Sequence, residues 1–243
     1  RDMKSGMADL DALGRVVTVA NGKGGVGKST TACNLAGLAA VAGWRVLLID
    51  FDPQGNAGHI LGYKWRGESD GGQHLVDVLM HGRPMTPLLT DVRKNLDVVP
   101  GGEALDSLED LLAGRLKRGQ TIDGLFADAL AAVAGDYDLV VVDTPPTRPL
   151  LLRLALGGTR WIVVPTRPGR TSIEGLRALA VDMAAARQAN PRLELLGALL
   201  YDVETGARVI RRNAIEDITK VLGGAAPVFK TVSIGIAEYK EGE

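Results

Sequence analysis

The stretch Gly22–Thr30 reads GKGGVGKST and follows an apolar run, Val16–Ala20. It matches the pattern G-x-x-x-x-G-K-[ST], in which glycines let the backbone turn with positive φ so that successive N–H groups point into one concavity. A helix-like run starts near Thr30 and would add its free N–H groups and positive dipole end to the same place. The stretch therefore predicts a phosphate-binding loop between a strand and a helix.

The fixed positions of the pattern are Gly22, Gly27, Lys28 and Ser29. Lys28 would reach the β- and γ-phosphates of a nucleotide, and the Ser29 hydroxyl would ligate Mg²⁺. A chance match is the alternative in a chain with 31 glycines. The strand pattern before the loop and the helix pattern after it argue against chance, because the motif works only between such elements.

Composition sets the broad class of the protein. The chain has 243 residues, of which 46% are hydrophobic and 4% aromatic, and this is enough for one large core of helices packed on strands. The net charge of −1 does not by itself favour nucleic acid, although a local basic patch remains open.

Cys33 is the only cysteine, which excludes an internal disulfide and a cysteine-cluster metal site within one chain. A single cysteine is typical of a reducing, cytoplasmic setting. The sequence shows no signal peptide and no apolar run of the roughly 20 residues that span a bilayer. We therefore expect a cytoplasmic protein without a membrane partner.

Carboxylates follow two apolar runs of the strand type. RVLLID (Arg45–Asp50) leads to Asp50 and Asp52, and YDLVVVDTPP (Tyr137–Pro146) carries Asp143 after four apolar residues. Ligands of open α/β sheets lie at the carboxyl ends of strands, and an aspartate in this position can order Mg²⁺. Acids that only cap a solvated turn are the alternative. The segment 53–58, rich in proline and glycine, is expected to be a loop rather than a helix.

Strand-like and helix-like runs alternate along nearly the whole chain. Strands are expected at 15–21, 45–50, 96–100, 137–146, 159–165, 193–200 and near 228, and helices at 30–43, 74–80, 105–116, 122–133, 150–156, 172–188 (with Ser172 as N-cap) and 207–222. This alternation predicts an α/β fold with one doubly wound, mostly parallel sheet and helices on both faces. Residues 1–14 would form a short arm and residues 15–243 a single phosphate-loop domain, because no linker or repeat is visible.

Three motifs together resemble one family. The loop KGGVGKST has an extra lysine, Lys23, near its start, DFDPQGN occupies 50–56, and VVVDTPP occupies 140–146. This combination resembles the ParA branch of the ParA/MinD ATPases, the deviant Walker A proteins that segregate plasmids and chromosomes. The resemblance covers roughly residues 15–240 and is closest around the loop and the strand that ends at Asp50.

The resemblance implies a role for each matching residue. Lys23 would reach across a nucleotide-sandwich dimer, Asp52 would orient the attacking water, and Asp50 and Asp143 would order Mg²⁺ together with Ser29. The implied catalytic residues are Lys23, Lys28 and Asp52, and the implied nucleotide-binding residues are Gly22, Lys23, Gly24, Gly25, Val26, Gly27, Lys28, Ser29, Thr30 and, near adenine, Pro168. A lysine supplied in trans resembles an arginine finger, worth roughly 10³–10⁵ in rate where it is fully positioned.

The implied function is a slow ATPase that acts as a timer. The ATP-bound homodimer would bind double-stranded DNA without sequence preference, and a ParB-like partner would stimulate hydrolysis and release. Arg208, Arg211 and Arg212 fall at i, i+3 and i+4 of a predicted helix, so they share one face and could contact phosphates. A solvated helix face with Glu216 and Asp217 as partners is the alternative. Such a protein would associate with the nucleoid.

Departures from the family pattern leave two points open. The stretch VVPTRPGRTSIEGL places Arg167, Gly169 and Arg170 where relatives often carry a glutamine and a glutamate, so the adenine edge or the dimer face would differ. Relatives usually continue into a last helix, which is either missing here or lies beyond Glu243.

Four other functions are alternatives, and each can be tested against features of the sequence. A MinD-like ATPase that acts on a membrane or a protein compartment would need a basic amphipathic helix at the C-terminus, and none is visible. A nitrogenase-type reductase would need cluster-bridging cysteines, and a bacterial tyrosine kinase would need a tyrosine cluster, whereas the chain offers Cys33 and Tyr239. A non-enzymatic scaffold is disfavoured because both lysines and Asp52 are present.

Overall fold

The computed structural model describes residues 12–203 and 208–232. They form one eight-stranded sheet in the order β3-β4-β2-β5-β1-β6-β7-β8, in which every neighbouring pair is parallel except β3 with β4. The strands are β1 (Val16–Val19), β2 (Val46–Asp50), β3 (Leu89–Arg93), β4 (Leu96–Val99), β5 (Leu139–Asp143), β6 (Trp161–Thr166), β7 (Glu194–Leu200) and β8 (Val228–Val232). The predicted α/β fold with a mostly parallel sheet is confirmed.

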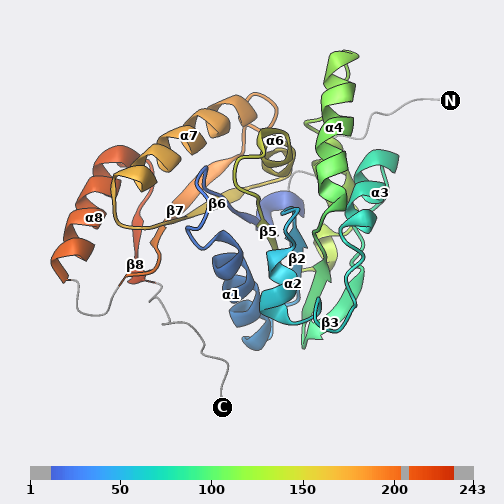
Figure 1. Cartoon of the computed structure of the whole chain (residues 1–243), viewed down its shortest axis with the longest axis horizontal. Helices are drawn as coiled ribbons and strands as arrows, with labels where there is room; N and C mark the ends of the chain where they lie inside the picture. Colours follow the sequence, from blue (N-terminus) through green and yellow to red (C-terminus); the bar gives the residue numbers. More distant parts are fainter. Residues whose placement is uncertain (1–11, 204–207, 233–243) are drawn as a thin grey trace.

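Helices cover both faces of the sheet (Figure 1). They are α1 (Lys28–Val41), α2 (Asn56–Leu61), α3 (Gln73–His81), α4 (Ala104–Lys117), α5 (Leu125–Ala131), α6 (Pro149–Gly157), α7 (Arg170–Ala186) and α8 (Arg208–Leu222), with short 3₁₀ turns at η1 (Ala12–Arg15) and η2 (Ala134–Asp136). Helices α1 and α2 pack on one face, and α3 to α8 pack on the other.

The alternation of side chains along β2 explains why both faces need a cover. Leu47 and Ile49 enter the core under α3 to α6, whereas Val46 and Leu48 enter the core under α1 and α2. All five residues of the strand are buried, as expected for a central strand of a parallel sheet. Cys33 belongs to the core under α1 and is 3% exposed, so it packs as a small apolar residue.

The expectation of a loop holds for residues 53–55 but was wrong for 56–58, because α2 begins at Asn56. Gly55 adopts a left-handed conformation (φ 60°) and turns the chain into the helix. The carboxylate of Asp50 then accepts a hydrogen bond from the Ala57 N–H at 3.3 Å and satisfies one of the free donors of the first turn. This cap comes from a neighbouring strand end, so local propensity could not reveal it.

Other differences from the expected elements lie at edges and ends. Strand β3 was not predicted, since its sequence LTDVR is mostly polar and exposed, as edge strands often are. Helix α7 begins at Arg170 after Gly169, two residues before the predicted cap Ser172. The predicted helix at 122–133 is shorter, with α5 limited to Leu125–Ala131.

The start of the described chain is tied to the sheet. Leu13 is 5% exposed and belongs to the core, and the indole N–H of Trp161 donates to the Gly14 carbonyl at 3.1 Å. The rest of the predicted arm, residues 1–11, lies outside the described residues, as do residues 233–243. Among the described helices, none combines the length and the apolar character needed to cross a bilayer.

Gly101 provides a test of how tightly the carboxyl edge of the sheet is packed. A methyl group there would lie 2.7 Å from the carbonyl oxygens of Asp50 and Asp52. We expect Gly101→Ala to lower the free energy of unfolding by about 1–3 kcal/mol, the usual cost of overpacking, measured by urea denaturation. Gly135→Ala is the control, since a Cβ at Gly135 meets nothing within 4 Å. Equal stability of the two variants would contradict this packing.

Candidate nucleotide-binding site

The predicted phosphate loop connects β1 to α1 at the carboxyl edge of the sheet. Gly25 and Gly27 have φ values of 70° and 81°, a region that side chains disfavour. Helix α1 begins at Lys28, with its first bond from the Thr31 N–H to the Gly27 carbonyl at 2.8 Å. The helix therefore starts inside the motif, and its free N–H groups face the concavity of the loop.

Lys28 is held inside the loop. The side chain is 6% exposed, and its Nζ donates to the Lys23 carbonyl at 3.0 Å. Burial is the main influence on the ammonium and lowers its pKa, whereas the nearby carboxylates Asp143 and Asp52 act in the opposite direction. A partly desolvated cation inside a ring of backbone donors is suited to bind phosphate oxygens.

Two predicted metal-site acids lie side by side. Parallel pairing of β2 with β5 places Asp50 directly opposite Asp143, and both are fully buried. Asp50 accepts hydrogen bonds from the N–H groups of Asp52 and Ala57. Its pKa is nevertheless raised well above the usual range, first by burial and then by the charge of Asp143.

Asp143 lacks comparable partners. Among the described residues, neither of its carboxylate oxygens has a hydrogen bond of ordinary geometry. Burial raises its pKa to about 7, and the charge of Asp52 acts in the same direction, while the Ser29 hydroxyl and the Lys28 ammonium offset part of the effect. Buried acceptors without well-aligned donors are costly, so this position is well suited to a cation or to the water that a cation holds.

Mg²⁺ fits this set of residues. The ion prefers oxygen ligands and usually takes one or two carboxylates together with substrate phosphates. Among the described residues, no group of three or more His, Cys, Asp or Glu side chains could hold a metal alone. The unsatisfied oxygens of Asp143, the adjacent Asp50 and the Ser29 hydroxyl therefore suit an ion that arrives with a nucleotide.

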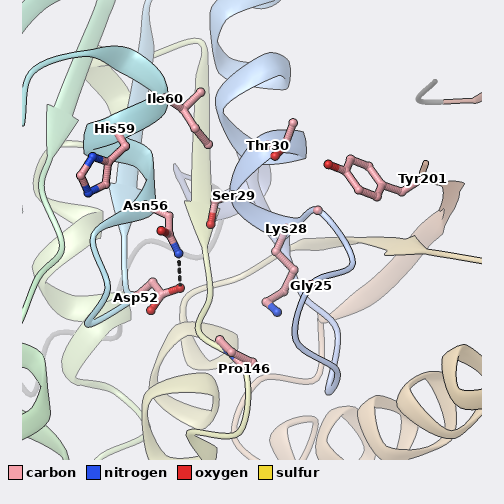
Figure 2. Close-up of a pocket in the computed structure, with 11 residues that line it drawn as sticks. Gly25, Lys28, Ser29, Thr30, Asp52, Asn56, His59, Ile60, Pro146 and Tyr201 are labelled. Atoms are coloured by element: carbon pink, nitrogen blue, oxygen red, sulfur yellow. Dashed lines mark hydrogen bonds between the residues drawn. The ribbon is translucent and has the colours of Figure 1, made fainter. Parts of the chain in front are cut away.

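Asp52 lies on the turn between β2 and α2. It is 4% exposed, and its Oδ1 accepts a hydrogen bond from the Gln54 N–H at 2.9 Å. The Asn56 amide donates to its Oδ2 at 3.4 Å, as the dashed line in Figure 2 marks. The Oδ1 atom thus stabilises the turn. The Oδ2 atom faces the cavity, and its one described hydrogen bond is the long one from Asn56.

A cavity of about 340 Å³ opens in front of the loop (Figure 2). Its lining residues are Gly25, Gly27, Lys28, Ser29, Thr30, Asp52, Asn56, His59, Ile60, Pro146 and Tyr201. Of the sequence-predicted residues, Gly22, Lys23, Gly24 and Val26 belong to the same loop but are not part of this lining. Asp50 and Asp143 are buried beneath it.

Tyr201, His59 and Ile60 were not predicted from sequence, and Pro168 is not among the lining residues. Tyr201 directly follows β7, and a methyl group at Gly27 would lie 2.3 Å from its ring, so the ring covers this side of the loop. Figure 2 shows its hydroxyl directed toward Thr30. Its place after a parallel strand could have revealed it, whereas His59 and Ile60 lie on α2, a helix that was not predicted.

The predicted basic face lies apart from this cavity. It is on α8, near the edge of the sheet that β8 forms (Figure 1). Arg208, Arg211 and Arg212 are exposed and border one shallow hollow with Ile215 and Glu216. Arg211 donates to the Lys230 carbonyl at 2.8 Å, and Arg212 is 4.0 Å from Glu216. Both interactions are exposed, and an ion pair as long and exposed as that of Arg212 with Glu216 contributes little to stability.

The buried acids predict a pH dependence of stability in the absence of nucleotide and metal. Folded Asp143 keeps its proton up to a pH of about 7, whereas an unfolded aspartate releases it near pH 4. The folded chain binds more protons in this window, so stability falls as pH rises. We expect Asp143→Asn to be more stable than wild type at pH 8 by about 2–4 kcal/mol, and to match it more closely at pH 5.

Urea denaturation at both pH values in the presence of a chelator measures this difference. Asp138→Asn is the control of opposite sign, because hydrogen bonds from Arg45 lower the pKa of Asp138 to about 2. This variant should lose stability at pH 8. A destabilised Asp143→Asn at pH 8 would contradict the repulsive environment inferred for Asp143.

Comparison with known proteins places this site in a family. A model of the AAA domain matches residues 14–195. The chain is similar to the chromosome partitioning protein ParA of Myxococcus xanthus, with 35% identity over 85% of this chain and 71% of the relative. It is also similar to the chromosome-partitioning ATPase Soj of Thermus thermophilus, with 38% identity over 81% of this chain and 73% of the relative.

A solved structure that holds a nucleotide and magnesium shares the fold. Cobyrinic acid a,c-diamide synthase of Mycobacterium smegmatis, determined with ADP and magnesium bound, has a TM-score of 0.73 at 28% identity, over 85% of this chain and 81% of that one. The synthase is not a partition protein, so this likeness supports the nucleotide-binding fold only. The two sequence relatives identify the family. The chain therefore belongs to the ParA family of partition ATPases, which hydrolyse ATP with Mg²⁺ as cofactor.

Proposed function

We propose that this chain is a DNA-partition ATPase that dimerises on ATP, binds duplex DNA without sequence preference and is released by slow, partner-stimulated hydrolysis. The observation that carries the proposal is a phosphate loop that contains Lys23 and whose Lys28 lies near Asp143, the acid paired with Asp50. The sequence relatives of this chain are chromosome-partitioning proteins. A ParB-like protein is the proposed activator, and the nucleoid or a plasmid is the proposed location.

Hydrolysis requires in-line attack of water on the γ-phosphate, which depends mostly on positioning and charge neutralisation. Lys28 and the N–H groups of the loop would hold the phosphates. Ser29, Asp50 and Asp143 would hold Mg²⁺, which neutralises charge on the β- and γ-oxygens when bound. The Oδ2 atom of Asp52 faces the cavity and would orient the attacking water.

Lys23 supports a site that is completed by a second copy of the chain. Its side chain is half-buried at the start of the loop, whereas the adjacent Gly24 and Gly25 are exposed. A partner could therefore approach the loop closely over these glycines. A lysine from that partner would then neutralise the charge that develops on the transferred phosphoryl group.

Nonspecific DNA binding is proposed for the basic face of α8. Exposed arginines on one helix face suit phosphate contacts, which position a protein without reading sequence. The net charge of −1 means that this attraction must be local, and a dimer would present two such faces. ATP-dependent dimerisation would thereby couple nucleotide binding to DNA affinity.

Asp52→Ala tests the proposed hydrolysis step. The hydrogen bonds described for the Asp52 carboxylate come from Gln54 and Asn56 on its own turn. ATP binding and dimerisation should therefore persist in the variant, while turnover should fall by about a hundredfold or more. Phosphate release, nucleotide titration and sedimentation measure the three properties. Asn56→Ala, which removes the long bond to Asp52 and one side chain of the cavity lining, is the comparison and should have a smaller effect. Wild-type turnover in Asp52→Ala would exclude the proposed role.

Duplex binding tests the proposed DNA function. Wild-type chain should bind DNA of random sequence only with ATP and Mg²⁺, and the affinity should decrease steeply as salt rises. Arg208→Ala with Arg212→Ala removes two cations per chain, so the slope of log affinity against log salt should become less negative by up to about 4 per dimer. Fluorescence anisotropy at several salt concentrations measures the slope.

The control for this experiment removes the same charge elsewhere. Lys94→Ala with Lys117→Ala changes exposed lysines on the opposite part of the sheet and should leave the slope unchanged. Binding that does not require ATP, or equal slopes for the two double variants, would count against the proposal.

A further inference from the structure

Asn21 is a buried polar residue that the proposed chemistry does not use. It lies between β1 and the phosphate loop and is 2% exposed. Its Nδ2 donates to the Pro165 carbonyl in β6 at 2.8 Å, and its Oδ1 accepts from the Lys23 N–H at 2.9 Å. A single side-chain amide therefore ties the backbone of Lys23 to a central strand.

The backbone of Lys23 has a second bond, since its carbonyl accepts the Nζ of Lys28 at 3.0 Å. The two lysines of the loop thus depend on the same stretch of backbone. Asn21 is the partner that anchors this stretch to the sheet. Without the amide, a glycine-rich loop with two positive-φ residues has wide conformational freedom.

Helix α7 presses on this amide. A Cβ at Gly175 would lie 2.4 Å from the Oδ1 of Asn21 and 3.4 Å from the Cβ of Lys23. On the loop side, a Cβ at Gly22 would lie 3.4 Å from the Cβ of Ala178. Glycine is unfavourable inside a helix, so Gly175 within the 17 residues of α7 points to a packing requirement.

We propose that Asn21 is a positioning residue that fixes where Lys23 projects, and that Gly175 lets α7 close over it. The inference rests on the proposed function, in which Lys23 acts on the nucleotide of a second subunit. A lysine that works across an interface must leave its own loop at a set angle. The Asn21 amide, held between β6 and α7, supplies that constraint without contacting the nucleotide.

Asn21→Ala should separate binding from turnover. Lys28 and the N–H groups of the loop remain, so the affinity of the chain for ADP with Mg²⁺ should stay near the wild-type value. A displacement of Lys23 by about 1 Å should lower kcat roughly a hundredfold and weaken ATP-dependent dimerisation. Calorimetry with ADP, sedimentation with ATP and phosphate release measure these quantities.

Gly175→Ala should give the same pattern, because its methyl group displaces the Oδ1 of Asn21. Gly37→Ala is the matched control: it is also a glycine inside a helix, α1, and a Cβ there meets nothing within 4 Å. Both alanines favour helix. Gly37→Ala should therefore keep wild-type kcat and gain thermal stability, whereas Gly175→Ala loses kcat.

The double variant decides whether the two residues act together. Once Asn21→Ala has removed the amide, the methyl group of Gly175→Ala has room, so the second change should lower kcat little further. Additive losses, a wild-type kcat in Asn21→Ala, or a parallel loss of ADP affinity and kcat would each overturn the proposal. A wild-type chain that fails to dimerise with ATP would overturn the proposed function, and with it the assigned target of Lys23.

Discussion

The parallel pairing of β1, β2 and β5 is the constraint on which the site depends. It brings the carboxyl ends of three strands to one edge and sets Asp50 opposite Asp143. Two carboxylates in a dry environment repel each other, and burial alone disfavours their charged forms. The sheet holds them there because its apolar faces are covered on both sides, so packing energy compensates for a locally unfavourable arrangement.

This arrangement links the site to the local structure around it. The same Asp50 carboxylate that faces Asp143 also caps α2, and α2 carries residues that line the cavity. A change in the charge of Asp50 would therefore alter its hydrogen bonds to the start of α2 and to the turn that carries Asp52. Cation binding and the geometry of the water-facing side of the cavity are thus physically connected.

The other side of the loop is held by packing rather than by charge. Helix α7 approaches closely enough that a glycine is needed at Gly175, and the Asn21 amide hydrogen-bonds both to β6 and to the loop. Helix α7 also packs against α8, which carries the basic face. The proposed DNA-binding helix is therefore one helix away from the backbone of Lys23.

Sequence alone determined much of this protein. The loop motif, the apolar strands that end in Asp50 and Asp143, and the alternation of elements predicted the α/β fold and most of the candidate site, because each depends on local pattern and spacing. The tertiary structure alone decided the start of α2, the edge strand β3, the position of the Tyr201 ring over the loop and the packing of Asn21 between β6 and α7. The Tyr201 ring and the Asn21 contacts join groups far apart in sequence. The start of α2 and the pairing of β3 depend on nearer groups, a carboxylate seven residues away and the next strand, whose contacts form only in the folded sheet.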